Sequence, residues 1–133
     1  MIGEEDEIVN YIGDKFKQWY NKIEPYVIPF NHSRYTSFNI NYEGCRLTIE
    51  NQHCHLTSNI CLEQYIGSCI RIIDFFAINT LILNKLLKRI ETIARQTQPN
   101  VRYIVYHPTT KLHGVTIDKY LTTMQGPEVL FLL

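Results

Sequence analysis

The sequence lacks an excess of charge of either sign. Its 133 residues include 13 lysines and arginines and 13 aspartates and glutamates, which gives a formal net charge of zero at pH 7. Proteins that bind nucleic acid through charge need a basic face. One predicted helical face does gather basic residues, namely Lys85, Lys88, Arg89 and Arg95. Because the overall charge is balanced, we favour solvated surface over a nucleic-acid interface for that face.

A membrane-spanning segment is also lacking. Such a span needs ~20 predominantly apolar residues, and the most apolar stretch, residues 72–95, is interrupted by Asp74, Asn84 and Lys85. The first ten residues, MIGEEDEIVN, are acidic and have neither the basic nor the apolar region of a signal peptide. We therefore expect a soluble, intracellular protein, cytoplasmic or nuclear, with no membrane partner.

No metal-binding motif is present. Two histidines, His53 and His55, would share one face of a strand while Cys54 between them points to the other face. Zinc sites usually contain closely spaced cysteine or histidine pairs, and none of the spacings here fits. The cysteines are Cys45, Cys54, Cys61 and Cys69. We expect no bound metal, and without a secretory signal we expect reduced thiols.

The first part of the chain has the periodicity of an amphipathic helix. Apolar residues recur at spacings of three and four over residues 4–23, among them Ile8, Ile12 and Phe16. Acidic residues fill the first turn, where carboxylates suit the positive end of the helix dipole. Pro25 ends this helix. We therefore predict an N-terminal helix with one apolar stripe.

From residue 35 the apolar period changes to two, which predicts strands. The segments YTSFNINY and CRLTIEN alternate on either side of Glu43-Gly44, so we predict a β-hairpin with a tight turn there. The segment HCHLTSNICL is predicted to form a third strand, and a fourth is predicted to begin near Cys69, just after Gly67. The middle of the chain is therefore predicted to be an antiparallel meander.

The stretch IIDFFAINTLILNKLLKRIETIAR, residues 72–95, changes its pattern midway. Its beginning is apolar at positions of both parities, as is typical of a central strand covered on two faces. After Asn79-Thr80 the apolar residues follow helical spacing, so we predict an amphipathic helix that Asn79 or Thr80 caps. Asp74 is unusual within so apolar a strand. We expect its carboxyl group to be paired, solvated at a bulge, or neutralised.

The last third of the chain predicts a strand, a short helix and a final strand. These are VRYIVYH (101–107), VTIDKYLTTM (115–124) and PEVLFLL (127–133). No repeat or linker divides the sequence, so we predict one domain over residues 1–133. The predicted fold is α+β. An N-terminal helix and an antiparallel meander precede a helix, strand, helix and strand, and all strands form one mixed sheet flanked by helices.

The segments FFAIN, LLKRIETIAR and VRYIVYH, followed by Tyr120 and Gly126, occur in an order that resembles the Gcn5-related N-acetyltransferase (GNAT) family. In that family a central strand leads into a long helix, and a further strand leads into a short helix carrying a tyrosine. The resemblance covers about half of the chain at the level of motifs. It implies a GNAT-like layout and an ancestral activity on acyl-coenzyme A.

One family motif is absent from this chain. In the family, the turn from strand to helix carries Arg/Gln-x-x-Gly-x-Gly/Ala, whose backbone amides hold the coenzyme A pyrophosphate. Glycine is needed there because a side chain would block the approach of phosphate. Here the turn is AINTLILN, which has no glycine. If coenzyme A or acetyl-CoA bound, the resemblance would place it at Ile78, Asn79, Thr80 and Asn84.

The resemblance also implies three catalytic candidates. Tyr120 matches the tyrosine that protonates the departing thiolate in the family. A general base that deprotonates an amine would be Asp74 or His107, and either would need a suitably perturbed environment. The structural alternative for Tyr120 is a packed core residue, because tyrosine is often buried.

Three functions therefore remain open, and the third is a nucleic-acid adaptor that would use the basic helical face. The leading hypothesis is a degenerate GNAT-like fold that acts as a protein-binding or structural module, without a cofactor and without ordinary acetyl-CoA chemistry. The alternative is an acyl-CoA-dependent N-acyltransferase that acts on a primary amine. Under the first hypothesis we expect a protein partner or a homo-oligomer. The abundance of isoleucine, asparagine and tyrosine is typical of AT-rich genomes, which makes a viral protein one expected origin.

Overall fold

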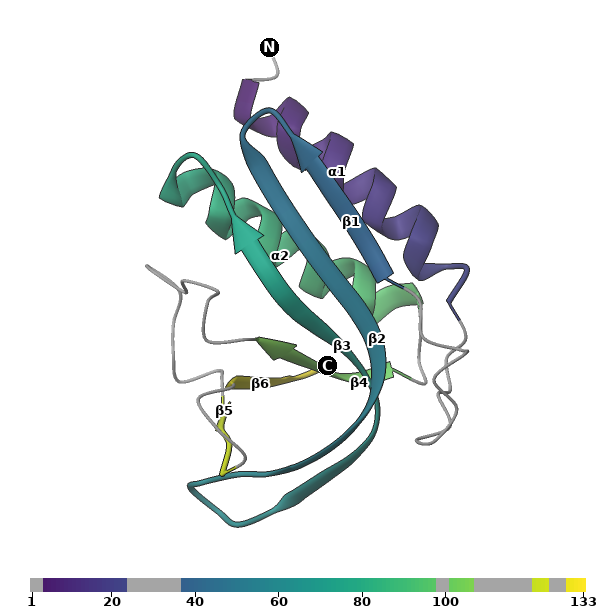
Figure 1. Cartoon of the computed structure of the whole chain (residues 1–133), viewed down its shortest axis with the longest axis vertical. Coiled ribbons are helices and arrows are strands. Elements are labelled where there is room, and N and C mark those ends of the chain that lie inside the picture. Colours follow the sequence, from purple (N-terminus) through teal and green to yellow (C-terminus); the bar gives the residue numbers. More distant parts are fainter. Residues whose placement is uncertain (1–3, 24–36, 98–100, 107–120, 125–128) are drawn as a thin grey trace.

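The computed structural model describes residues 4–23, 37–97, 101–106, 121–124 and 129–133. The elements in chain order are α1 (Glu4–Tyr20), β1 (Ser37–Tyr42), β2 (Cys45–Thr57), β3 (Gln64–Phe76), α2 (Thr80–Thr97), β4 (Val101–Tyr106), β5 (Leu121–Thr122) and β6 (Val129–Leu132) (Figure 1). The fold is α+β, with the predicted N-terminal helix, meander and later helix. No helix in the described ranges is both long enough and apolar enough to cross a membrane.

The strands form one mixed sheet in the order β1-β2-β3-β4-β6-β5. The strands β1, β2 and β3 pair antiparallel in sequence order, as predicted for the meander. β4 then pairs parallel with β3. A parallel neighbour requires a crossover connection, and α2 supplies it. On the far side of β4, the strand β6 pairs antiparallel with both β4 and β5.

The turn between β1 and β2 is the tight turn that the sequence predicts. Tyr42 pairs with Cys45, so Glu43 and Gly44 alone form the loop. Both have positive φ, 49° at Glu43 and 80° at Gly44. Two successive positive φ values characterise the type I′ turn, whose twist matches that of the flanking strands.

The meander has three strands, and the prediction of about four is wrong. The segment HCHLTSNICL does not form a strand of its own, because β2 continues through its first half to Thr57. The chain reverses between Ser58 and Glu63, where the Ser58 amide donates to the Glu63 carbonyl at 2.9 Å. β3 begins at Gln64, so Gly67 lies inside the strand, with φ at +146°. No glycine or proline separates the two predicted segments within β2, so the strand continues through both.

The predicted helix at 115–124 is wrong over its last part. Leu121 and Thr122 form β5 against β6, and Thr123 makes an isolated bridge to Ser58. Residues 115–120 lie outside the described part of the chain. Pairing with β6 decides the conformation of this short segment, because tertiary contacts outweigh the small difference between its helix and strand propensities.

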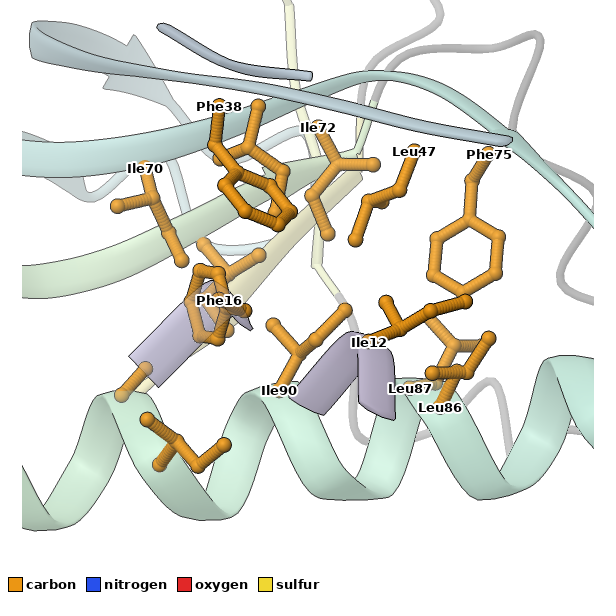
Figure 2. Close-up of a cluster of buried hydrophobic side chains, with 14 of the residues drawn as sticks. Ile12, Phe16, Phe38, Leu47, Ile70, Ile72, Phe75, Leu86, Leu87 and Ile90 are labelled. Carbon is orange, nitrogen blue, oxygen red and sulfur yellow. The ribbon is translucent and has the colours of Figure 1, made fainter. Parts of the chain in front are cut away.

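Both helices pack on the same face of the sheet, behind β1, β2 and β3 in Figure 1. Figure 2 shows the resulting core, where Phe16 and Ile90 of the helices lie across from Ile70 and Ile72 of β3, and Ile12 lies across from Phe75. An aromatic group also belongs to this core: Phe16, Trp19, Tyr20 and Phe38. Burial of these apolar side chains is the main force that holds α1 and α2 to the sheet.

A second apolar cluster lies on the opposite face, at the other end of the β2–β3 hairpin. Its buried members are Cys54, Leu56, Tyr65, Cys69, Val105 and Leu130. The hairpin bends toward β5 at the lower end of Figure 1. Its end is held there because the Met124 amide donates to the Thr57 carbonyl at 2.9 Å. The Asn59 side chain also donates to the Thr123 carbonyl at 2.9 Å.

Candidate functional site

The sheet face opposite the helices carries a row of polar side chains near β1. These alternate with the core residues, so they follow from the strand period of two. They are Asn39 and Asn41 of β1, Arg46, Thr48, Glu50 and Gln52 of β2, and Arg71 and Asp74 of β3. Among the described elements no helix covers this face, and we call it the polar face of the sheet.

Asp74, a predicted catalytic candidate, lies on the polar face beside a β-bulge. Thr48 pairs with Asp74 and Ile49 pairs with Ile72, which leaves Ile73 as the extra residue. The Asp74 carboxylate lies 3.4 Å from the Arg46 Nε atom, and both side chains are about half exposed. Asp74 is therefore paired and placed at a bulge, as expected for an acid in an apolar strand.

A pocket of 270 Å³ opens beside this ion pair. Its lining residues are Asn39, Ile40, Asn41, Arg46, Thr48 and Asp74. The Thr48 hydroxyl donates to Asn39 Oδ1 at 2.7 Å, which fixes one wall. The sequence alone does not identify Arg46 as the partner of Asp74, because the register of two strands decides which charged side chains meet. The alternation in CRLTIEN was the available signal, since it already placed Arg46 on the polar side.

The four predicted cofactor-binding residues lie at the start of α2. Asn79 caps the helix: its Oδ1 accepts the Ile82 amide at 2.9 Å, and its backbone carbonyl accepts the Leu83 amide at 3.2 Å. Thr80 is the exposed first residue of α2, and Asn84 lies one turn further along. Asn84 Oδ1 is buried and has no hydrogen-bond partner within the described residues.

Ile78 packs against the turn between β1 and β2. A Cβ atom added at Gly44 would lie 2.9 Å from the Ile78 Cγ2 atom, so the two turns are in close contact. Ile78 thus places a branched side chain beside the start of α2, and the cap on α2 already accepts one of the free amides of the first turn.

Exposed apolar side chains gather around the same turn. Phe76 is 48% exposed, Ile78 is 59% exposed and Leu81 is 50% exposed. Arg46 lies over the Phe76 ring, with its guanidinium carbon 5.1 Å from the ring centroid. We call Phe76, Ile78 and Leu81 the corner patch. The sequence alone does not reveal this patch, because hydrophobicity does not distinguish these residues from their buried neighbours.

The two remaining catalytic candidates, His107 and Tyr120, lie outside the described residues. β4 ends at Tyr106, which pairs with Ile72 of β3. Of the three candidates, the structure therefore places Asp74 alone.

The basic face of α2 is partly neutralised by α1. Lys85 Nζ lies 3.0 Å from Asp6 Oδ1, and Arg89 Nη2 lies 3.8 Å from Asp14 Oδ1. A pocket of 390 Å³ lies between the two helices at these pairs. The carboxylates of α1 thus offset two of the four basic residues that the sequence placed together.

Within the described ranges, no three histidine, cysteine, aspartate or glutamate side chains are placed to hold a metal ion. His53 and His55 do lie in β2 on the opposite face from Cys54, as the strand period predicts. Comparison with protein-family models, with curated proteins and with solved structures finds no match to this chain.

Proposed function

We propose that this protein is a binding module on a degenerate GNAT-like layout and that it acts through protein contacts at the corner patch. The observation that carries the proposal is the exposure of Phe76, Ile78 and Leu81 around the turn between β3 and α2. In the family that the sequence resembles, this turn holds the cofactor. Neighbouring exposed apolar groups are better suited to contact with an apolar protein surface than to binding a charged pyrophosphate.

Two further features support the loss of cofactor binding. The Ile82 amide, which points out of the first turn of α2, already donates to Asn79 Oδ1 at 2.9 Å. The Ile78 side chain rests on Gly44 and occupies space beside the turn. An anion at this helix end would have to displace the cap to reach that amide.

Aromatic and arginine side chains are the groups that most often anchor protein interfaces. Phe76 and Arg46 stack at one edge of the corner patch. The ion pair between Arg46 and Asp74 lies next to them. The patch thus combines an apolar centre with a polar rim, which is the usual anatomy of a recognition surface.

The test is a pair of matched isoleucine substitutions. Ile78→Asp places a charge in the corner patch, and Ile60→Asp places the same charge at the exposed end of the β2–β3 hairpin. Self-association is measured by sedimentation velocity, and partner recovery from cells is measured by quantitative affinity capture. We expect Ile78→Asp to abolish the specific contacts, while Ile60→Asp and wild type behave alike. Equal binding by wild type and Ile78→Asp, with both folded, would contradict the proposal.

The alternative function is an acyl-CoA-dependent N-acyltransferase, and one observation favours it. β3 continues to Phe76, past its last described pair with β4 at Ile72, and Asp74 lies in this extension beside the 270 Å³ pocket. Under this alternative Asp74 or His107 is the base and Tyr120 is the acid. Tyr120→Phe should then lower kcat strongly in an amine acetylation assay, and unchanged activity would rule out that assignment.

A further inference from the structure

Two cysteines meet in the second apolar cluster, far from the corner patch. Cys54 of β2 pairs with Gly67 of β3, and Gln52 of β2 pairs with Cys69 of β3. The two cysteines are thus diagonal neighbours on the same face of adjacent strands. Their thiols are hydrogen-bonded to each other. Gly67 has no side chain opposite Cys54, and the Tyr103 ring lies near this position: a Cβ atom added at Gly67 would lie 3.6 Å from the Tyr103 Cε2 atom.

The cysteine pair also borders a cavity. A pocket of 190 Å³ is lined by Cys54 and Cys69, together with Gln52, His53, His55, Leu56, Arg71 and Val105. Cys54 is 7% exposed and Cys69 is 1% exposed. A small solute in the pocket therefore reaches Cys54 more readily than Cys69.

The surroundings give the two thiols different acidities. The hydrogen bond from Cys69 lowers the pKa of Cys54, although burial opposes this effect. The same hydrogen bond and burial raise the pKa of Cys69, which the nearby Arg71 guanidinium lowers only in part. The thiolate is the reactive form of cysteine. Cys54 is accordingly the nucleophile of the pair, and Cys69 holds its proton.

We propose that Cys54 and Cys69 form a redox-active dithiol that reduces hydrogen peroxide or another small hydroperoxide in the 190 Å³ pocket. The Cys54 thiolate attacks the peroxide, so that an S–O bond forms, the O–O bond breaks, and alkoxide or hydroxide leaves and takes up a proton. Cys69 then attacks the sulfenic sulfur of Cys54. An S–S bond forms, the S–O bond breaks, and the hydroxyl group leaves with the Cys69 proton as water.

The overall reaction is balanced without a further reactant. Two thiols and one hydroperoxide give one disulfide, one alcohol or water molecule, and one water molecule. The sulfurs are oxidised by two electrons, and the peroxide is reduced by two. An added dithiol such as dithiothreitol returns the pair to the reduced form by thiol–disulfide exchange.

The experiment oxidises the folded protein and maps its thiols. Cys61 is exposed, so a Cys61→Ser background removes its separate reactions. The reduced protein is treated with hydrogen peroxide, quenched with an alkylating reagent at successive times and digested for mass spectrometry. Buried Cys45 lies in the main core and is the internal control, because burial raises its pKa. We expect Cys54 to lose its free thiol roughly tenfold faster than Cys45, and we expect a peptide that joins Cys54 to Cys69.

Two variants separate the roles of the thiols. In Cys69→Ser, dimedone should trap a sulfenic acid on Cys54, because the second step has lost its thiol. In Cys54→Ser, Cys69 should react no faster than Cys45. Equal rates at Cys54 and Cys45 in the Cys61→Ser protein would overturn the proposal, as would a disulfide that joins either thiol to Cys45. The mapping requires neither of the two variants, so it stands even if one of them does not fold.

Discussion

Ile90 and Ile60 are the same amino acid in opposite environments. Ile90 is fully buried between α2 and the sheet, whereas Ile60 is 74% exposed at the end of the β2–β3 hairpin. We expect Ile90→Ala to lower the free energy of unfolding by about 2–5 kcal/mol, because it leaves a cavity in the core. The same change at Ile60 should alter it by no more than about 0.5 kcal/mol. Chemical denaturation of both variants checks this, and equal losses would contradict the described packing.

Tyr20 is the residue whose ionisation should couple most directly to folding. Its side chain is buried, its hydroxyl donates to the Ala94 carbonyl at 3.2 Å, and burial raises its pKa well above 10.0. The contribution of a raised pKa is complete below the unfolded-state value and is lost as pH rises through the folded-state value. Replacing Tyr20 with Phe should lower the free energy of unfolding by about 1 kcal/mol at pH 8, because the hydrogen bond of the hydroxyl is lost.

The difference between wild type and Tyr20→Phe should then shrink as pH rises above 10. Only the wild type gains an ionised tyrosine at this position on unfolding. Thermal melts of both proteins between pH 8 and alkaline pH measure this. A difference in Tm that stays constant into the alkaline range would show that Tyr20 is not coupled to folding in this way.

The site residues could be predicted from the sequence only where a local rule applied. An acid in an apolar strand had to be paired or placed at a bulge, and Asp74 is both. The exposure of Phe76, Ile78 and Leu81 followed no such rule. It depends on how the turn between β3 and α2 meets the turn at Gly44, and that contact joins residues far apart in the sequence.

At the scale of elements, the start of α2 depends on one side chain. Asn79 Oδ1 accepts the Ile82 amide, so Asn79→Ala should destabilise the protein by about 1 kcal/mol. Asn79→Asp keeps the acceptor and adds a charge that the helix dipole favours, so it should be neutral or stabilising. Thr80→Ala is the control for the neighbouring position. Equal destabilisation by Asn79→Ala and Asn79→Asp would contradict the cap.

The turn between β1 and β2 places a glutamate in a backbone conformation that this residue type rarely adopts. Glu43 has φ of 49°, a region that costs most L-residues about 1–2 kcal/mol and that asparagine tolerates better. Glu43→Asn should therefore raise the free energy of unfolding by about 0.5–1 kcal/mol.

Gly44→Ala is the opposite test in the same turn. It should lower stability because φ at this position is 80° and the new Cβ atom would lie 2.9 Å from Ile78. Thermal unfolding of the two variants against wild type is the measurement. A gain in stability from Gly44→Ala would contradict the turn geometry.

Most elements could be predicted from periodicity alone, and the errors share one cause. The sequence placed α1, the β1–β2 hairpin, α2 and β4 correctly, because each has a long pattern or a clear turn signal. The apolar pattern wrongly predicted two strands in place of β2, and it wrongly predicted a helix over the segment that contains β5. In both places the pairing partner, β3 or β6, decides the structure. Pairing between distant strands leaves no local signal in a single sequence.

At the scale of the whole molecule, the sheet separates two regions of different chemistry. One face buries the main core under α1 and α2. The other is polar beside β1 and apolar at the bent end of the hairpin, where the cysteine pair lies. Strands β3 and β4 are parallel, and α2 connects them in the chain. The proposed protein binding depends on the turn between β3 and α2, where the corner patch is exposed.

The most direct test of the proposed binding module without a cofactor is a calorimetric titration of the protein with acetyl-CoA, paired with thermal melts at the same ligand concentrations. With Ile78 on the turn and Asn79 capping α2, we predict no saturable heat and no change in Tm. Saturable binding together with a ligand-dependent rise in Tm would contradict the binding-module account and favour the acyltransferase.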